Sequence, residues 1–184
     1  VLLCNPSQAL LLTHARKAQL LCSLSGQYGP RFGGVIVVSK QSQIADVSEL
    51  RTKAVAALGR QSAGGYLFQA SHLKKRGLLA RRDYGVVFAE TQDEALWSLR
   101  KGEVAAAFIR SGMIEQLRNE SYMDLNHFVV LDQRQDPAFP LLHTTELFPE
   151  HYLLTLTGFP DGLASDMKQA LRAIPKDSKI LTGT

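Results

Sequence analysis

The stretch "AVAALGRQSAGGYLFQASHLKKRG", residues 54–77, decides the fold class of this chain. Its first part, residues 54–58, is a short apolar run typical of a buried strand. From Tyr66 onward the apolar residues recur with helical spacing, as at Ala70 and Leu73. A strand that leads through a glycine-rich turn into a helix is the repeating unit of parallel α/β sheets, so this stretch predicts that unit.

The rest of the chain continues the alternation of strands and helices. Helical patterns follow at 95–99 and 163–174, and two long irregular connections, 24–32 and 133–148, mark places where separate lobes can join. Further apolar runs with the composition of strands occur at 1–4, 19–23, 35–38, 86–89, 104–109, 128–131 and 152–156. This order predicts an α/β protein with a mainly parallel sheet that helices cover on both faces.

The composition narrows the classes of function. With 184 residues and 45% hydrophobic content, the chain can form one domain or two small lobes. Its 21 basic residues exceed the 17 acidic ones by only four, so we expect no nucleic-acid partner. The five histidines show no HxxxH or HExxH spacing, and Cys4 and Cys22 form no CxxC pair, so neither a metal site nor a cofactor is indicated. The two cysteines are either buried thiols or one bridge, and the sequence does not choose.

The turn between strand and helix contains Ser62, Gly64 and Gly65. In an open parallel sheet, ligands bind beyond the carboxyl ends of the strands, where helix N-termini present N–H groups and a partial positive charge. Ser62 can cap the helix or donate to a ligand, and the glycines have no Cβ to keep an anion away from the backbone. The competing interpretation is structural, a tight turn whose glycines allow the helix to pack closely on the strand.

Two further strand ends carry similar groups. In "VVFAETQDEALWSLRKGEVAAAF", residues 86–108, Thr91 and Gln92 open the next helix, although Thr91 can also serve as a helix cap alone. Arg110 follows the next strand and has the forked donor geometry that suits oxyanions. Because three successive strands end in small polar or cationic groups, we expect Ser62, Thr91 and Arg110 to share one crevice that attracts anions.

Long blocks of the chain resemble the phosphonate-type periplasmic substrate-binding proteins. The similar blocks are "FGGVIVVSKQSQIADVSELRTKAVAALGRQSAGGYLFQASHLKKRGL", residues 32–78, and "YGVVFAETQDEALWSLRKGEVAAAFIRSGMIEQL", residues 84–117. Within that family, the chain is most similar to the sensor domains of tetrathionate-sensor-type membrane histidine kinases. The blocks that resemble those domains are "NPSQALLL" (5–12), "FGGVIVVS" (32–39) and "FPLLHTTELFPEHYLLTL" (139–156).

The resemblance implies a type 2 periplasmic binding architecture with two lobes. Residues 39–125 would form the second lobe, and residues 1–38 with 126–184 the remainder of the first lobe, whose N-terminal part we expect to be missing from this stretch. No apolar run approaches the roughly 20 residues of a membrane span, and no signal peptide is visible. Because an incomplete lobe would expose apolar side chains, a homodimer is a possible partner arrangement.

The resemblance also implies a function of binding rather than catalysis. We expect a periplasmic sensor domain of an inner-membrane protein, joined to membrane and kinase segments of the same full-length chain, that closes around a small sulfur oxyanion or phosphonate-like anion in the cleft between the lobes. The alternative is the solute-binding component of a phosphonate or phosphate ABC transporter. An enzyme on this scaffold would need Cys4 or Cys22 beside His14 or His143, and the spacing does not favour such a pair.

The resemblance carries the family's ligand-binding positions onto two turns of this chain. They are Ser62, Gly64, Gly65 and Tyr66 in the first turn, and Thr91 and Gln92 in the second. Weaker candidates are Asn5, Ser7, Gly33, Gly34, Arg110 and His143. The family commonly has His-Asp after the threonine, whereas this chain has Gln92-Asp93. Since glutamine donates through its amide but cannot become cationic, we expect a dianion to depend more on Arg110 and the helix dipole.

Overall fold

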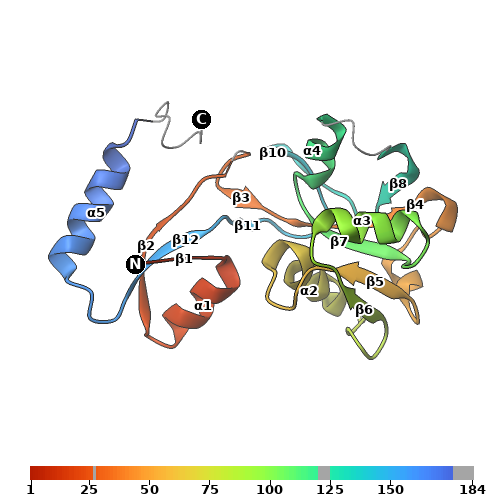
Figure 1. The fold of residues 1–184 in the computed structure, drawn as a ribbon, viewed down its shortest axis with the longest axis horizontal. Coiled ribbons are helices and arrows are strands. Elements are labelled where there is room, and N and C mark those ends of the chain that lie inside the picture. Colours follow the sequence, from red (N-terminus) through yellow and green to blue (C-terminus); the bar gives the residue numbers. More distant parts are fainter. Residues whose placement is uncertain (27, 120–124, 176–184) are drawn as a thin grey trace. The chain divides into compact units, whose positions relative to one another are not determined.

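The structure is a computed structural model that describes residues 1–26, 28–119 and 125–175 (Figure 1). The chain forms two compact units, unit 1 from Val1–Arg31 and Pro149–Thr184, and unit 2 from Phe32–Phe148. It passes from one unit to the other at the short strands β3 (Arg31–Phe32) and β11 (Phe148–Pro149). The lobe expected at 39–125 lies inside unit 2. Unit 2 includes more residues on both sides of that range, because the strand that begins at Gly34, a strand at 128–130 and two threonines, Thr144 and Thr145, bond to the same sheet.

Unit 2 is built around a five-stranded sheet with the order β6-β5-β7-β4-β8. Its strands are β4 (Gly34–Ser39), β5 (Ala54–Ala57), β6 (Gly85–Phe88), β7 (Ala106–Arg110) and β8 (Phe128–Val130). β5 pairs in parallel with β6 and with β7, and β4 pairs antiparallel with β7 and with β8. Four strands therefore run in one direction and β4 in the other, which confirms the predicted α/β class with a mostly parallel sheet.

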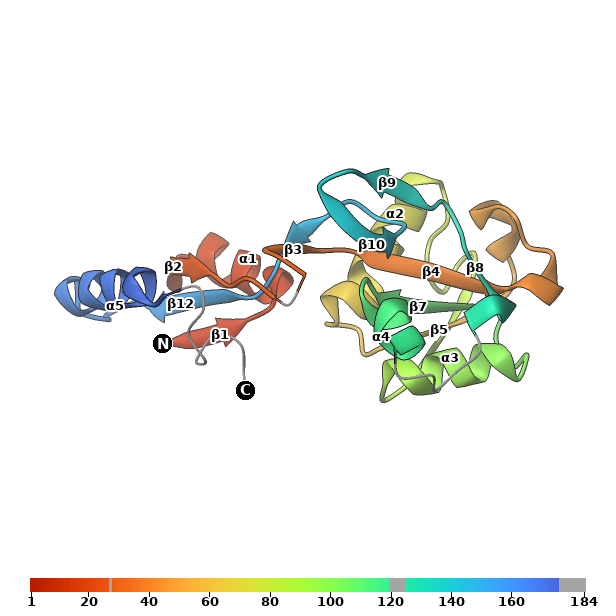
Figure 2. The ribbon, with the colours of Figure 1, turned by 90° about the horizontal axis from the view of Figure 1, so that it is seen from above.

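Helices cover both faces of this sheet (Figure 2). On one face lie a π-helical turn (Ala63–Leu67), the helix α2 (Phe68–Lys75) that continues it, and a 3-10 helix (Val47–Leu50). On the other face lie α3 (Gln92–Arg100) and α4 (Met113–Asn119). Two further 3-10 helices, Lys40–Ser42 and Leu125–His127, lie in the connections.

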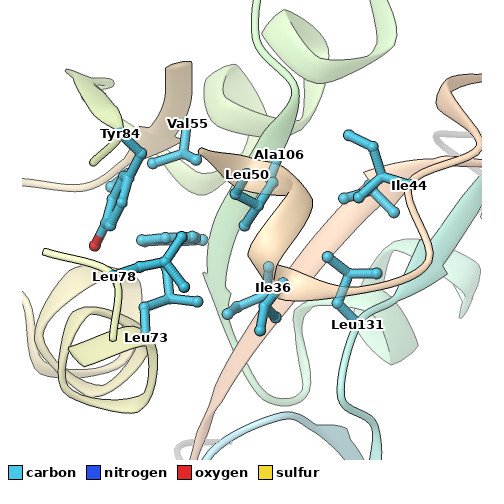
Figure 3. Close-up of a cluster of buried hydrophobic side chains, with 13 residues drawn as sticks. Ile36, Ile44, Leu50, Val55, Leu73, Leu78, Tyr84, Ala106 and Leu131 are labelled. Carbon is cyan, nitrogen blue, oxygen red and sulfur yellow. The ribbon is translucent and has the colours of Figure 1, made fainter. Parts of the chain in front are cut away.

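The core of unit 2 has two layers because β4 is apolar on both faces. Ile36 and Leu73 belong to the layer under α2, whose side chains point toward one another in Figure 3. Val35 and Leu96 belong to the layer under α3 and α4. All four side chains are buried. Such continuous burial explains why 35–38 is an unbroken apolar run rather than an alternating one.

The connection expected to be irregular at 133–148 contains a hairpin, so that expectation was partly wrong. Its strands are β9 (Arg134–Asp136) and β10 (Phe139–His143), which pair antiparallel. After the hairpin, Thr144 Oγ1 accepts a hydrogen bond from Ile36 N at 3.0 Å and Thr145 Oγ1 accepts one from Gly34 N at 2.9 Å. These buried bonds fasten the segment to β4, a long-range pairing that local sequence pattern does not reveal.

Unit 1 has a small antiparallel sheet with the order β1-β12-β2, unlike the mainly parallel sheet expected there. Its elements are β1 (Leu2–Cys4), α1 (Pro6–His14), β2 (Ala18–Ser23), β12 (Tyr152–Leu156) and α5 (Asp161–Ala173). Cys4, Ala9, Ala18 and Leu154 form its small buried core, so α1 packs on the sheet.

Cys4 and Cys22 are free thiols, which answers the question that the sequence left open. Cys4 lies opposite Tyr152 and Cys22 opposite Leu153, so the two cysteines are on strands that flank β12 from either side. Two strand spacings amount to roughly 9–10 Å, beyond the reach of a disulfide, whose Cα atoms lie within about 7 Å. Burial raises the pKa of the Cys4 thiol.

Candidate functional site

The strand directions in unit 2 bring several predicted residues to one edge of the sheet. Because β5, β6 and β7 are parallel, their carboxyl ends lie at the same edge, which we call the carboxyl edge. The antiparallel strand β4 begins there, with Gly34 opposite Arg110. The carboxyl edge therefore collects the segment after β5, the segment after β6, the end of β7 and the residues that precede β4.

The 62–65 turn (Ser62, Ala63, Gly64 and Gly65) follows β5. Ser62 has extended backbone, and its Oγ accepts a hydrogen bond from Gly65 N at 3.2 Å, so the predicted cap is formed. The π-helical turn then runs without a break into α2. The first N–H groups of a helix lack partners inside the helix, and the dipole makes that end positive. Turns of π type are frequent at functional sites.

Gln69 fixes this turn to the sheet. Its side chain is fully buried, and Nε2 donates to Gly64 O at 2.7 Å and to Ile109 O at 2.8 Å. Since both partners are carbonyl oxygens, only the amide nitrogen can face them. An added Cβ on Gly34 would lie 2.5 Å from Gln69 Cδ. Gly34 is therefore a glycine because the amide of Gln69 fills the space beside it, and its own N–H already donates to Thr145.

Arg110, at the end of β7, lies against the 62–65 turn. An added Cβ on Gly64 would be 3.3 Å from Arg110 Cγ. The guanidinium carbon Cζ of Arg110 lies 4.3 Å from the centre of the Phe32 ring. The side chain is half-buried, so a positive charge is held at the carboxyl edge while part of it remains accessible.

Thr91 and Gln92 begin α3 at the same edge. Thr91 is exposed, and its Oγ1 accepts from Glu94 N at 3.1 Å, so it serves as the predicted cap. A hydroxyl that accepts at its oxygen still carries its own hydrogen to donate. Gln92 Oε1 accepts from Arg110 N at 2.5 Å, which joins the start of α3 to the end of β7. The carboxamide of Gln92 keeps its N–H donors for another partner.

The predicted site residues thus fall into two groups. Gly64, Gln92 and Arg110 are linked by the contacts described above. Ser62 and Thr91 cap the two helices at the same edge, and Gly65 donates its N–H to the Ser62 cap. Tyr66 is half-buried, and its ring packs edge-on against Phe88 with 5.4 Å between ring centres.

The weaker candidates have structural partners within their own unit. Gly33 N donates to the buried Ser111 Oγ at 2.9 Å. His143 is 3% exposed, and its ring lies against Phe139 with Nδ1 3.1 Å from Leu141 O. In unit 1, Asn5 Oδ1 accepts from Ser7 Oγ at 2.7 Å and from Gln8 N at 3.0 Å, so Asn5 caps α1 and Ser7 lies in its first turn.

Phe32, Gln69 and Ser111 belong to the edge but were not singled out from the sequence. Each acts through a partner far along the chain, such as the 78 positions between Gly33 and Ser111. No local spacing signals such contacts. Among the residues described, no group of three or more His, Cys, Asp or Glu side chains is placed to hold a metal ion. Within the same ranges, no helix has the length and apolar character needed to cross a membrane.

An α/β fold with a mostly parallel sheet and polar groups gathered at its carboxyl edge is the arrangement in which open α/β proteins bind ligands. The chain belongs to the family described as "ABC transporter, phosphonate, periplasmic substrate-binding protein", whose model matches residues 1–183. This match confirms the family expected from the sequence.

Individual proteins agree with the family match. The chain is 29% identical to the tetrathionate sensor histidine kinase TtrS of Salmonella typhimurium over 177 residues, which is 93% of this chain and 30% of that protein. The structure of XAC2383 from Xanthomonas citri bound to ATP has a TM-score of 0.78 at 17% identity and is covered to 62% by 92% of this chain. PhnD1 from Prochlorococcus marinus in complex with methylphosphonate has a TM-score of 0.61 at 11% identity, with 96% of this chain covering 65% of that structure. The chain thus spans less than two thirds of each of these proteins.

Proposed function

We propose that this chain is the extracytoplasmic ligand-binding domain of a sensor histidine kinase and that it binds a small anion at the carboxyl edge of unit 2. The observation that carries the proposal is the contact of Arg110 with the 62–65 turn. A guanidinium and the N-terminus of a helix both favour negative charge, and here the aliphatic part of Arg110 lies against Gly64, in the turn that begins the helix.

Different groups at the carboxyl edge would supply the charge and the hydrogen-bond donors for an oxyanion. Arg110 supplies the formal charge and a forked pair of donors. The turn supplies backbone N–H groups and the Ser62 hydroxyl, while Gln92 and Thr91 supply neutral donors from the start of α3. Because Gln92 cannot become cationic, the charge of a sulfur oxyanion or phosphonate-like ligand is balanced by Arg110 and the helix dipole.

The role as a sensor rests on the likeness to TtrS. That protein is a tetrathionate sensor histidine kinase, and this chain covers 30% of its length. A kinase, membrane segments and a place at the inner membrane are therefore part of the proposal. The matched family is described as substrate-binding proteins, which supports the proposal that the domain itself binds a ligand and is not an enzyme.

A second role is favoured by the family description. The family is named for the substrate-binding component of phosphonate ABC transporters, and PhnD1 has the same fold with methylphosphonate bound. The gene sequence on either side separates the two roles, since a hydrophobic span followed by a kinase indicates a sensor. A secretion or lipoprotein signal with a stop shortly after the domain indicates a transporter component.

Calorimetric titration of the full-length protein tests the proposed function. The probes are tetrathionate, thiosulfate, sulfate, methylphosphonate, phosphate and ATP. We expect at least one of these anions to bind, and we expect Arg110→Gln to weaken that binding at least tenfold. Lys101→Gln is the matched control, because it removes one exposed positive charge that pairs with Glu103 at the far end of α3. The proposal is wrong if no probe binds, or if Arg110→Gln binds as tightly as the wild type.

A further inference from the structure

We propose that Phe32 is a positioning residue, which holds the Arg110 guanidinium beside the 62–65 turn and is itself held by Phe68 and Phe148. The inference rests on the proposed function and names the group that prepares its charged residue for the anion. All of these residues belong to unit 2.

The Arg110 guanidinium lies over the ring of Phe32. The Arg110 guanidinium carbon lies 4.3 Å from the centre of the Phe32 ring, well inside the roughly 6 Å range of a cation–π interaction. A cation over the face of a ring is attracted by the ring quadrupole. The Phe32 ring therefore restrains the arginine side chain.

The same Phe32 ring also lies against Gly64 of the 62–65 turn. An added Cβ on Gly64 would lie 2.8 Å from Phe32 Cε2 and 3.2 Å from Cδ2. Gly64 is a glycine at this point because the ring occupies the space that a side chain would take. Phe32 thus meets both halves of the candidate site, and it fixes the separation between the positive side chain and the backbone donors.

Phe32 packs against Phe68, which in turn packs against Phe148. The rings of Phe32 and Phe68 have centres 5.2 Å apart, and the rings of Phe68 and Phe148 are stacked with centres 4.0 Å apart. Phe32 and Phe68 are 4% and 8% exposed. Phe68 begins α2, directly after the π-helical turn. The three packed rings of Phe32, Phe68 and Phe148 are therefore attached to the helix whose N-terminus lies at the candidate site.

The consequence is preorganisation. A free arginine side chain loses much rotational freedom when it is fixed on a ligand, and this loss weakens binding. An arginine that already rests on a ring has lost part of that freedom before the ligand arrives. The expected gain in anion affinity is roughly three- to tenfold, from the usual strength of a partly buried cation–π pair.

Fluorinated phenylalanines at position 32 provide the test. One, two or three fluorine atoms weaken the negative face of the ring stepwise while its shape is nearly unchanged. In the full-length protein, we expect the affinity for tetrathionate, thiosulfate, sulfate, methylphosphonate or phosphate to fall with each added fluorine, and Phe32→Leu to bind roughly three- to tenfold more weakly than the wild type. In an Arg110→Gln background, we expect fluorination to have no effect. A purely structural role of Phe32 would not produce this dependence on Arg110.

The matched control is Trp97→Leu, which removes another ring that carries a cation, since Arg100 lies over Trp97 at 5.1 Å. We expect this variant to bind the anion as the wild type does. If the wild type binds one of the probes and the fluorinated series is flat, the role of Phe32 is disproved and the proposed function stands. If the wild type binds none of them, both ideas fail.

Discussion

Gly64 and Arg110 lie so close together that a single methyl group cannot be added between them without displacing a neighbour. A Cβ on Gly64 would stand 3.3 Å from Arg110 Cγ and 2.8 Å from the Phe32 ring. The start of the helix and the end of β7 are thus packed against each other through a glycine. A strained or shifted side chain here would alter the position of the guanidinium and of the ring together.

We therefore expect Gly64→Ala to lower both stability and anion affinity. Overpacking of a buried position of this kind costs about 1–3 kcal/mol in the free energy of unfolding. Chemical unfolding and calorimetric titration measure the two effects. The control is Gly59→Ala in the same loop, where an added Cβ would meet no atom within 4 Å, so it should leave both quantities nearly unchanged. Equal behaviour of the two variants would contradict the packing described here.

Gln92→Glu tests whether the ligand is an anion. The new carboxylate can still accept the Arg110 backbone N–H, so we expect the fold to be preserved. Its negative charge would oppose an anion at the same edge, and the expected loss of affinity is at least tenfold, or about 1.4 kcal/mol. The loss should shrink at high salt because the repulsion is screened. Unchanged affinity in calorimetric titration, with Thr91 and Arg110 intact, would show that the ligand is neutral or binds elsewhere.

Gln69→Leu should destabilise unit 2 although it removes no charge and replaces the amide with an apolar side chain of similar size. The change leaves the carbonyl groups of Gly64 and Ile109 without the donor that they now share, and each buried unsatisfied acceptor costs about 1–3 kcal/mol. We expect a loss of roughly 2–4 kcal/mol in chemical unfolding. Gln41→Leu, at an exposed position, should stay within about 0.5 kcal/mol of the wild type. A loss no larger than that of Gln41→Leu would show that Gln69 does not fix the turn.

The sequence predicted the elements of unit 2 well because their signals are local. A few neighbouring residues are enough to predict the strand at 35–38, the helix cap at Thr91 and the glycine-rich turn after β5. The structure has β4, α3 and the π-helical turn at these places. Parallel pairing then brings the strand ends to one edge as a consequence of topology. That step was also open to prediction, since Ser62 and Thr91 follow β5 and β6, Arg110 is the last residue of β7, and these strands end at the same edge.

The contacts that shape the edge were beyond local reasoning. The pattern around Gln69 predicts a helix face, and nothing in it shows that the amide reaches Ile109, 40 positions away. Phe32 stands in a short apolar block with two glycines, and its partner Arg110 belongs to another strand. Gly34 illustrates the ambiguity of glycine, because the family resemblance made it a weaker ligand-binding candidate and the structure shows that it makes room for a buried side chain.

The contacts of Asp83 make the stability of the fold depend on pH. Its carboxylate accepts from the Arg82 side chain at 2.8 Å, from Leu79 N at 2.7 Å and from Arg51 at 2.6 Å. The hydrogen bond from Arg82, followed by that from the Leu79 N–H, lowers the pKa of Asp83 from 3.8 to about 2. Because the folded pKa is lower than the unfolded one, the ionised carboxylate stabilises the fold above about pH 4, and this contribution is lost as the pH falls toward 2.

We expect Asp83→Asn to be less stable than the wild type at neutral pH and the difference to disappear below about pH 2, so that the stability of the variant depends less steeply on pH. Urea unfolding at a series of pH values measures this slope. The slope should be reduced rather than abolished, since hydrogen bonding to Lys75 also lowers the pKa of Glu146. Glu103→Gln, which changes an exposed carboxylate 3.8 Å from Lys101, should keep the wild-type slope. An Asp83→Asn protein with the full wild-type slope would show that these contacts do not stabilise the fold.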